Sequence, residues 1–148
     1  MKHDLPSFDL EGYLPYQVSV IAGQLSSNLA SLYQEKFGIT VAEWRILVNL
    51  AYSDSKTVRD IQQRVHLDKA KVSRAVVGLE DRGYLTKKID PDDRRLLHLE
   101  LTEEGETLVA ELVPLAQEFQ SKVAEKFQDD FATLQSQMTQ LMKALSDG

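Results

Sequence analysis

The chain has 148 residues and no cysteine, with 43% hydrophobic and 27% charged residues, a balance typical of a soluble globular protein. This length allows one domain with its own core, or a small domain with an association arm. The lack of cysteine excludes disulfides, thiolate metal sites and thiol-based redox sensing. No apolar run approaches the roughly 18 to 20 residues of a membrane span, and no signal peptide is apparent, so we expect a cytoplasmic location.

The net charge of −6 is unevenly distributed along the chain. Residues 56–95 contain eleven Lys and Arg against seven Asp and Glu, so this segment carries +4 and the remainder carries −10. Phosphate binding depends on Lys and Arg, so this basic middle could contact nucleic acid despite the acidic total. The alternative is a solvated surface that happens to be rich in lysine.

The first predicted element is a long helix from Gly12 to Gly38, after a polar arm over residues 1–11. Pro15 is tolerated in the first helical turn, and glycine commonly ends a helix. Apolar residues recur every three or four positions, which marks one face of the helix. These residues are Leu14, Val18, Ile21, Leu25, Leu29 and Leu32. The face either fills the core of this chain or associates with another chain.

Three shorter helices follow. Thr40 and Glu43 form a capping box, which begins a helix through Tyr52. Thr57 begins a short helix that stops near His66, and Asp68 caps the next one immediately. Two short helices joined by a tight turn are typical of a helix-turn-helix.

The helix that begins at Asp68 has an apolar side at Val72, Val76 and Leu79. At about 100° per residue, the opposite side is small and partly cationic. It comprises Ala70, Lys71, Ser73, Arg74 and Val77. Gly83 ends this helix, and residues 84–89 and 96–101 are rich in strand formers. The turn between them carries two arginines, so we predict a hairpin with a basic tip.

The C-terminal part is predicted to be helical. Thr102 is the N-cap of a helix with an acidic first turn, and Pro114 should kink it. Asp129 and Asp130 permit a break before a last helix with nearly heptad spacing. The first and last helices therefore form two acidic, amphipathic arms, which would pack on each other or on a second copy.

Several short motifs, in this order and spacing, carry a resemblance to a known family. They are Ile39-Thr40 ahead of Trp44, Leu67-Asp68, Val72-Ser73-Arg74, Leu79-Glu80-Asp81-Arg82-Gly83-Tyr84-Leu85, Asp93-Arg94-Arg95 and Leu101-Thr102-Glu103-Glu104-Gly105. From about Leu14 to its C-terminus the chain resembles the MarR family of winged helix-turn-helix transcription regulators.

The resemblance implies a mainly α fold with a small β-hairpin wing. Residues 38–102 would be a winged helix-turn-helix DNA-binding domain, and residues 1–37 and 103–148 a helical dimerisation region of the same compact chain. The implied function is that of a repressor: a homodimer binds a pseudopalindromic site on double-stranded DNA and is released by a small aromatic or phenolic ligand. The implied recognition helix, residues 68–82, enters the major groove.

Arg74 is the residue expected to read a base, because its guanidinium offers two donors that match O6 and N7 of guanine. The alternatives are a phosphate contact or a salt bridge to Glu80 or Asp81. Ser73 can bind a base edge or a phosphate, and Ala70 leaves room for close approach or a thymine methyl group. Lys69 and Lys71 in the first turn suit phosphates.

The wing residues Arg94 and Arg95 suit a narrow A·T-rich minor groove, where the potential is most negative. The alternative is a salt bridge with Asp92 or Asp93 that keeps the turn ordered, and the resemblance implies that Asp93 positions Arg95. Thr57 could donate a contact to a phosphate, and the alternative is that helix capping is its sole role.

No cofactor is expected. The histidines, at positions 3, 66 and 98, are too scattered for a metal site. Five aromatic residues either line a ligand pocket or fill the core: Tyr13, Tyr16, Tyr33, Trp44 and Phe119. No cysteine nucleophile, histidine cluster or glycine-rich phosphate loop indicates an enzyme. The more serious alternative is a winged-helix module that binds proteins and not DNA.

Overall fold

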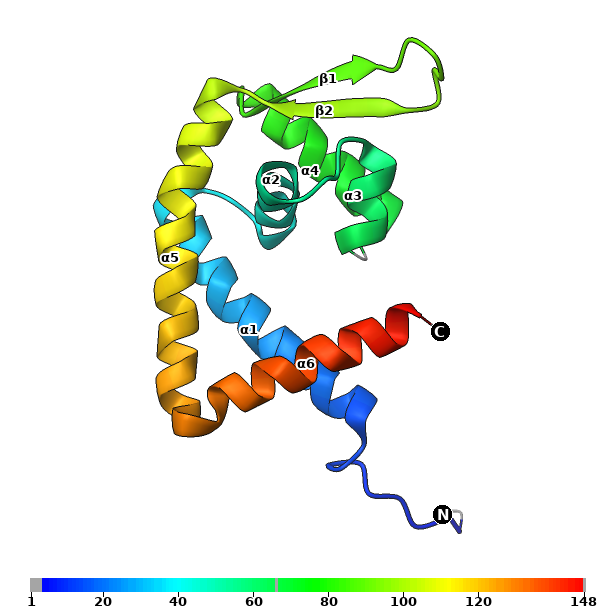
Figure 1. The fold of residues 1–148 in the computed structure, drawn as a ribbon, viewed down its shortest axis with the longest axis vertical. Helices are drawn as coiled ribbons and strands as arrows, with labels where there is room; N and C mark the ends of the chain where they lie inside the picture. The colour runs from blue at the N-terminus through cyan, green and yellow to red at the C-terminus, as the bar shows by residue number, and fades with distance from the viewer. Residues whose placement is uncertain (1–3, 66, 148) are drawn as a thin grey trace. The chain divides into compact units, whose positions relative to one another are not determined.

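The computed structural model describes residues 4–65 and 67–147, which form two compact units that divide between Val109 and Ala110 (Figure 1). The elements are α1 (Leu14–Phe37), α2 (Val41–Tyr52), α3 (Val58–Val65), α4 (Lys69–Asp81), β1 (Leu85–Ile89), β2 (Leu97–Leu101), α5 (Glu103–Phe127), the 3₁₀ turn η1 (Gln128–Asp130) and α6 (Phe131–Ser146). This is the predicted mainly helical chain with one small hairpin.

Caps mark the helix ends that the sequence predicted, although α1 begins at Leu14 and not at Gly12. Helix α1 has proline in its first turn and ends at Gly38, whose φ of 63° is left-handed. The capping box of α2 is present, with the Thr40 side chain bonded to the Glu43 amide and the Glu43 side chain bonded to the Thr40 amide. At the start of α4, a carboxylate oxygen of Asp68 accepts from the Lys71 amide at 2.8 Å.

Strands β1 and β2 pair antiparallel, with Leu85 opposite Leu101 and Ile89 opposite Leu97. They are one residue shorter at their starts than predicted. A short bridge between Thr57 and His98 joins β2 to the loop before α3, and the Leu99 amide donates to the Lys56 carbonyl at 2.8 Å. The hairpin is therefore attached to the helix-turn-helix by backbone hydrogen bonds.

The core of the first unit lies among α2, α3, α4 and the base of the hairpin, which Figure 1 groups together. Its fully buried aliphatic side chains come from each of these elements and from the short loop before α2. They include Ile39, Ile46, Leu47, Ile61, Val72, Leu79 and Leu85. Burial of one such side chain contributes about 1.5–3 kcal/mol, so this packing holds α4 with its apolar side inward.

The second unit contains the rest of α5, η1 and α6. Helix α5 runs through Pro114 without interruption. The predicted break after it is confirmed: Gln128 has a φ of 61°, and α6 begins at Phe131. No helix within residues 4–65 and 67–147 is both long and apolar enough to cross a membrane.

Candidate nucleic-acid interface

The outer side of α4 exposes the residues predicted to contact DNA. Lys69, Ala70, Lys71, Ser73 and Arg74 are all exposed. The opposite side of the helix is buried against α2 and α3. Apolar packing thus fixes which side of α4 faces outward, and the outward side is small and cationic. A smooth cationic helix can enter a major groove, which admits one α-helix.

Arg74 has no ion-pair partner among the described residues. Glu80, one of the two carboxylates considered for it, instead pairs with Lys87 of β1 at 3.0 Å. The Arg74 guanidinium is exposed with its donors available. Such a group can form the bidentate contact that guanine offers.

The first turn of α4 is already capped. The Asp68 side chain accepts a hydrogen bond from the Lys71 amide, so that amide is not available to a phosphate. The side chains of Lys69 and Lys71 remain exposed beside it. Phosphate contacts at this end of α4 would therefore come from the two ammonium groups, which act as point charges.

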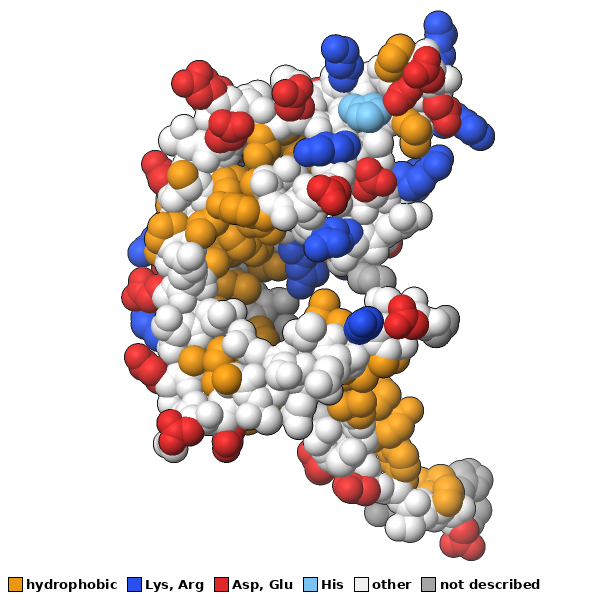
Figure 2. Space-filling view, in the orientation of Figure 1, with side chains coloured by type: hydrophobic (Ala, Val, Ile, Leu, Met, Phe, Trp, Pro, Cys, Tyr) orange, Lys and Arg blue, Asp and Glu red, His pale blue; other side chains and the backbone are white. Residues whose placement is uncertain are grey.

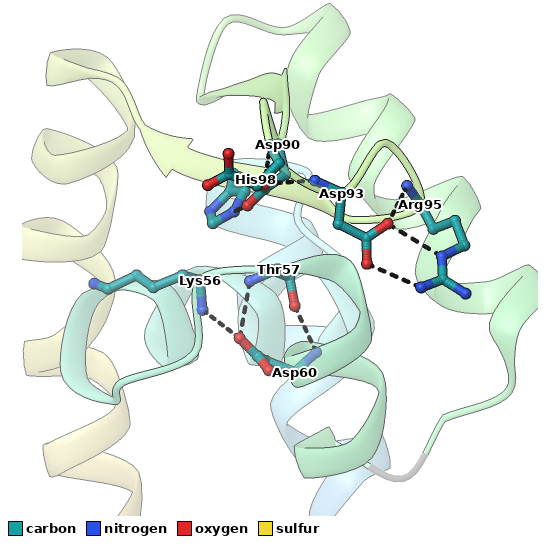
Figure 3. Close-up of polar contacts among 8 residues, drawn as sticks. Lys56, Thr57, Asp60, Asp90, Asp93, Arg95 and His98 are labelled. Atoms are coloured by element: carbon teal, nitrogen blue, oxygen red, sulfur yellow. Dashed lines mark hydrogen bonds and ion pairs between the residues drawn. The ribbon is translucent and has the colours of Figure 1, made fainter.

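The hairpin tip is organised around Asp93 and Arg95 (Figure 3). Nε of Arg95 donates to Oδ1 of Asp93 at 3.1 Å and Nη2 donates to Oδ2 at 3.2 Å, while the Arg95 amide also donates to Oδ1 at 3.0 Å. The hydrogen bond from the Arg95 side chain holds the pKa of Asp93 below its usual range. The Arg95 side chain is nonetheless 83% exposed. The carboxylate orients the guanidinium, which still faces solvent.

Asp90 is a wing residue that the sequence prediction did not single out. One of its oxygens accepts from the amides of Asp92 and Asp93 at 2.8 and 2.9 Å, and the other lies 2.6 Å from Nε2 of His98 (Figure 3). The contact with the His98 side chain lowers the pKa of Asp90. An aspartate two residues before its amide partner is a common turn signal, which could have identified it.

Thr57 is 7% exposed, and its hydroxyl accepts from the Asp60 amide at 3.0 Å. Asp60 in turn accepts from the amides of Lys56 and Thr57 at 3.0 and 3.1 Å (Figure 3). The bond from the Lys56 amide is the main reason why the pKa of Asp60 is lowered. The observed arrangement is a helix cap, and a phosphate contact from Thr57 stays a prediction.

The surface around these residues is basic. Figure 2 shows Lys and Arg side chains spread over the hairpin and the helices beside it. Arg94 is exposed at the hairpin tip next to Arg95. Arg59 on α3 lies close enough to Asp93 to contribute to its lowered pKa, after the Arg95 hydrogen bonds. The basic middle of the sequence is therefore gathered on one region of the first unit.

The predicted aromatic set does not form one group. Tyr33 is fully buried and packs on Trp44, with ring centroids 5.0 Å apart, whereas Tyr13 and Tyr16 are exposed on or next to α1. Phe119 belongs to the second unit. A polar depression of about 610 Å³ lies elsewhere, at the end of α2 and on α3, and is lined in part by Tyr52, Ser55 and Arg64.

His98, the one histidine of the three within the described residues, contacts Asp90 in the wing. The other two histidines, at positions 3 and 66, lie outside the described residues. In the described part of the chain, no three His, Asp or Glu side chains gather as metal ligands would.

Comparison with known proteins identifies the kind of protein to which these features belong. A model of the MarR family matches residues 37–96, which contain α2, the helix-turn-helix, β1 and the turn after it. The HTH-type transcriptional regulator YdgJ of Bacillus subtilis is 31% identical over an alignment of 113 residues, which covers 62% of this chain and 69% of that relative.

Solved structures share the fold over nearly the whole chain. A MarR/EmrR family regulator from Acinetobacter is 29% identical, with a TM-score of 0.81 over 95% of this chain and 96% of its own. MepR from S. aureus, solved as a complex with DNA, is 20% identical, with a TM-score of 0.75 over 90% of this chain and 98% of its own. At that identity the second likeness concerns the fold alone.

Proposed function

Since the chain belongs to the MarR family of transcriptional regulators, we propose that two copies bind a pseudopalindromic site on double-stranded DNA and act there as a repressor in the cytoplasm. Each copy contributes α4 to a major groove and its hairpin to the adjacent minor groove. Arg74 reads a base, Ser73 and Ala70 face the groove floor, and Lys69 and Lys71 contact phosphates. Arg95, oriented by Asp93, enters the minor groove with Arg94 beside it.

The observation that carries this proposal is the state of the two arginines. Arg74 is exposed and has no ion-pair partner among the described residues, so its donors are free for a ligand. Arg95 is exposed but is held by Asp93 in a bidentate pair. Preorganisation of this kind lowers the entropy lost on binding. A free base reader and an oriented minor-groove reader match the two grooves of one DNA half-site.

The homodimer is supported by apolar side chains that the first unit leaves exposed. Residues 5–21 include nine large apolar residues with at least 37% of their surface exposed. They are Leu5, Phe8, Leu10, Tyr13, Leu14, Tyr16, Val18, Val20 and Ile21. Figure 2 shows apolar side chains along the start of α1 and the segment before it. A stable monomer rarely leaves so much contiguous apolar surface in water, so a second copy is the occupant that we propose.

In the second unit, α6 exposes Met138, Met142 and Leu145 along its near-heptad spacing. We propose that this face also contacts the second copy. A small aromatic or phenolic ligand that binds near the arms would change the distance between the two copies of α4 and so release DNA. Tyr13 and Tyr16 are the exposed aromatic residues from which such a site would draw.

The test is selection of bound DNA from a random pool with the full chain. We expect an enriched pseudopalindrome with half-sites about 10 base pairs apart, one helical turn, because paired recognition helices face the same side of the duplex. Affinity should fall steeply with salt as counterions are released. Repeating the selection with phenolic compounds then identifies an effector by the loss of bound DNA.

A protein-binding winged-helix module is the second candidate, because this architecture also occurs without DNA binding. That candidate predicts no enrichment and no salt-dependent retention of DNA. An enriched single site without a repeat would contradict the paired arrangement while leaving DNA binding intact. Enrichment of a repeat that Arg74→Ala no longer selects would support both the site and its reader.

A further inference from the structure

Arg82, the residue that follows α4, donates a hydrogen bond from each of its guanidinium nitrogens. Nη1 donates to the Gly38 carbonyl at 3.0 Å, Nη2 donates to the carboxylate of Glu43, and Nε makes a longer bond of 3.4 Å to the Gly78 carbonyl. The guanidinium carbon also lies 5.6 Å from the centre of the Tyr84 ring. One side chain therefore connects the end of α4 with the end of α1 and the first turn of α2.

The Glu43 carboxylate, which accepts from Arg82, is buried, and both of its oxygens accept hydrogen bonds. The Glu43 side chain is 9% exposed. Its Oε1 accepts from the Thr40 amide at 3.0 Å, and Oε2 accepts from Arg82. Gly78 of α4 makes room for it, because a Cβ at this position would lie 3.1 Å from Oε2. Removal of Arg82 would leave a buried carboxylate with one partner, which is strongly unfavourable.

The backbone at the end of α4 also anchors α5. Gly83 has a φ of 81°, and the Tyr84 and Gly83 amides donate to the carbonyls of Leu79 and Glu80, both at 2.9 Å, which is a Schellman end. Thr102, the N-cap of α5, donates from its hydroxyl to the Gly83 carbonyl at 2.6 Å and from its amide to the Tyr84 carbonyl at 3.1 Å. Residues 82–84 are thus joined to both α1 and α5.

We propose that Arg82 is the positioning residue that fixes the direction of α4 relative to α1, so that a displacement of α1 is passed to the DNA-reading helix. Burial of Val72, Val76 and Leu79 attracts α4 to the core, but apolar attraction has no preferred direction. A planar guanidinium has fixed donor directions, so its hydrogen bonds depend on the orientation of α4. Those of Arg82 connect α4 with two other helices. The significance of the movement rests on the proposed function, in which α4 reads DNA and α1 contacts the second copy.

The test measures the distance between α1 and α4 inside one chain. The sequence has no cysteine, so Glu35→Cys and Val77→Cys, both at exposed positions, carry the only two spin labels. The labelled chain is diluted with unlabelled chain so that only pairs within one chain are measured by electron paramagnetic resonance. The labelled parent should give one narrow distance distribution.

Arg82→Ala and Glu43→Gln should each broaden or shift that distribution. The double variant should match either single variant, because both remove the same connection. Arg82→Lys keeps the charge but loses the planar fork, so it should also broaden the distribution. Lys87→Ala is the matched control: it removes the 3.0 Å pair with Glu80 at the same end of α4 and should leave the distribution as in the parent.

If Arg82→Ala and Arg82→Lys keep the distance distribution of the parent but have a lower midpoint of thermal unfolding, the proposal is overturned. Arg82 would then only stabilise the fold. If Arg82→Ala fails to fold, Glu43→Gln, which keeps the shape of the side chain, decides the question by the same measurement. A functional readout uses the selected DNA site with and without one extra base pair between its half-sites. The affinity for the selected site divided by the affinity for the site with the extra base pair should fall toward one in Arg82→Lys. Failure of the parent to bind DNA would contradict the proposed function, while the distance measurement would still decide on Arg82.

Discussion

At the scale of single residues, function depends on which polar groups the fold leaves free and which it occupies. The amide of Lys71 is occupied by Asp68 and the amides of Lys56 and Thr57 by Asp60, so none of these three is available to a phosphate. Arg74, one turn after Lys71 on α4, is exposed. The capacity for recognition therefore lies in long cationic side chains more than in helix N-termini.

Substitution of Arg74 should separate base reading from charge. Arg74→Ala should cost about 1–3 kcal/mol of binding free energy on the selected site and relax the preference at one base position, as expected when a bidentate contact to guanine is lost. Lys69→Ala is the comparison, since loss of a phosphate contact weakens binding about equally on all sequences. Titration of a panel of single-base variants of the site distinguishes them. An equal loss for Arg74→Ala on every sequence would make Arg74 a phosphate contact.

Tyr33, unlike the exposed arginines, has a polar group in the interior. Its hydroxyl is buried and has no hydrogen-bond partner among the described residues. Burial raises the pKa of this hydroxyl to about 12, so it stays protonated throughout the neutral range. Tyr33→Phe should leave the free energy of unfolding unchanged or raise it by up to about 1 kcal/mol, since a buried donor without a partner costs stability. Tyr33→Ala, which removes the whole ring, should lower it by about 3–5 kcal/mol. Urea unfolding measures both, and a loss above about 1 kcal/mol in Tyr33→Phe would reveal that the hydroxyl has a hydrogen-bond partner.

At the scale of elements, the hairpin is held at two levels. Strand β2 is attached to the loop before α3 through the bridge between Thr57 and His98, and the hairpin tip is ordered by Asp90 and Asp93. Glycine fixes the junction at its start, since Gly83 has a positive φ. The wing is therefore a rigid element that presents Arg95 at a set position.

Asp93 and Arg95 should have separable effects on the wing. Arg95→Ala should flatten the preference for A·T flanks and reduce the salt slope of binding by about one. Asp93→Asn keeps the arginine but frees it, so it should weaken the preference without changing the slope. Lys88→Ala, an exposed residue of β1, should leave the A·T preference unchanged. An unchanged A·T preference in Arg95→Ala would remove the wing from sequence reading.

The acid dependence of the tip follows from the lowered pKa of Asp93. A carboxylate whose pKa is lowered by folding contributes order above the usual aspartate pKa of about 3.9, and this contribution disappears as the pH falls through the lowered value. The A·T preference should accordingly be constant from neutral pH down to mildly acidic pH. Binding measured on A·T and G·C flanks at pH 5.5 and 7.5 checks this.

At the scale of the whole molecule, the chain combines a basic reading surface with acidic arms, and the arms expose apolar residues that water does not favour. Ile21 on α1 is 54% exposed. Ile21→Glu should convert the dimer to monomer, because it would bury an unpaired carboxylate in the contact between copies. Ser19→Glu adds the same charge at an exposed position on the opposite side of α1 from Ile21 and should leave the dimer intact.

Light scattering gives the mass of each variant, and circular dichroism controls for folding. The monomer should lose affinity for the two-half-site DNA and keep a weak affinity for one half-site. A dimer that persists unchanged in Ile21→Glu would exclude the α1 face from the contact between copies.

The sequence by itself determined what depends on neighbours within a few positions. Caps at Thr40, Asp68 and Thr102, the turn glycines and the three-and-four spacing of apolar residues are local signals, and they predicted the helices, the hairpin and the outward side of α4. These features follow from backbone hydrogen bonding and side-chain periodicity, which need no knowledge of distant residues.

Only the tertiary structure decided how distant groups meet. Glu43 and Arg82 are 39 positions apart, and Thr57 meets His98 across a still longer interval, so no spacing rule links them. The burial of Thr57 and the pairing of Glu80 with Lys87, which leaves Arg74 free, were likewise set by packing. The physical reason is that apolar burial brings the elements together without direction, and the polar partners that then fix their orientation depend on which surfaces have met.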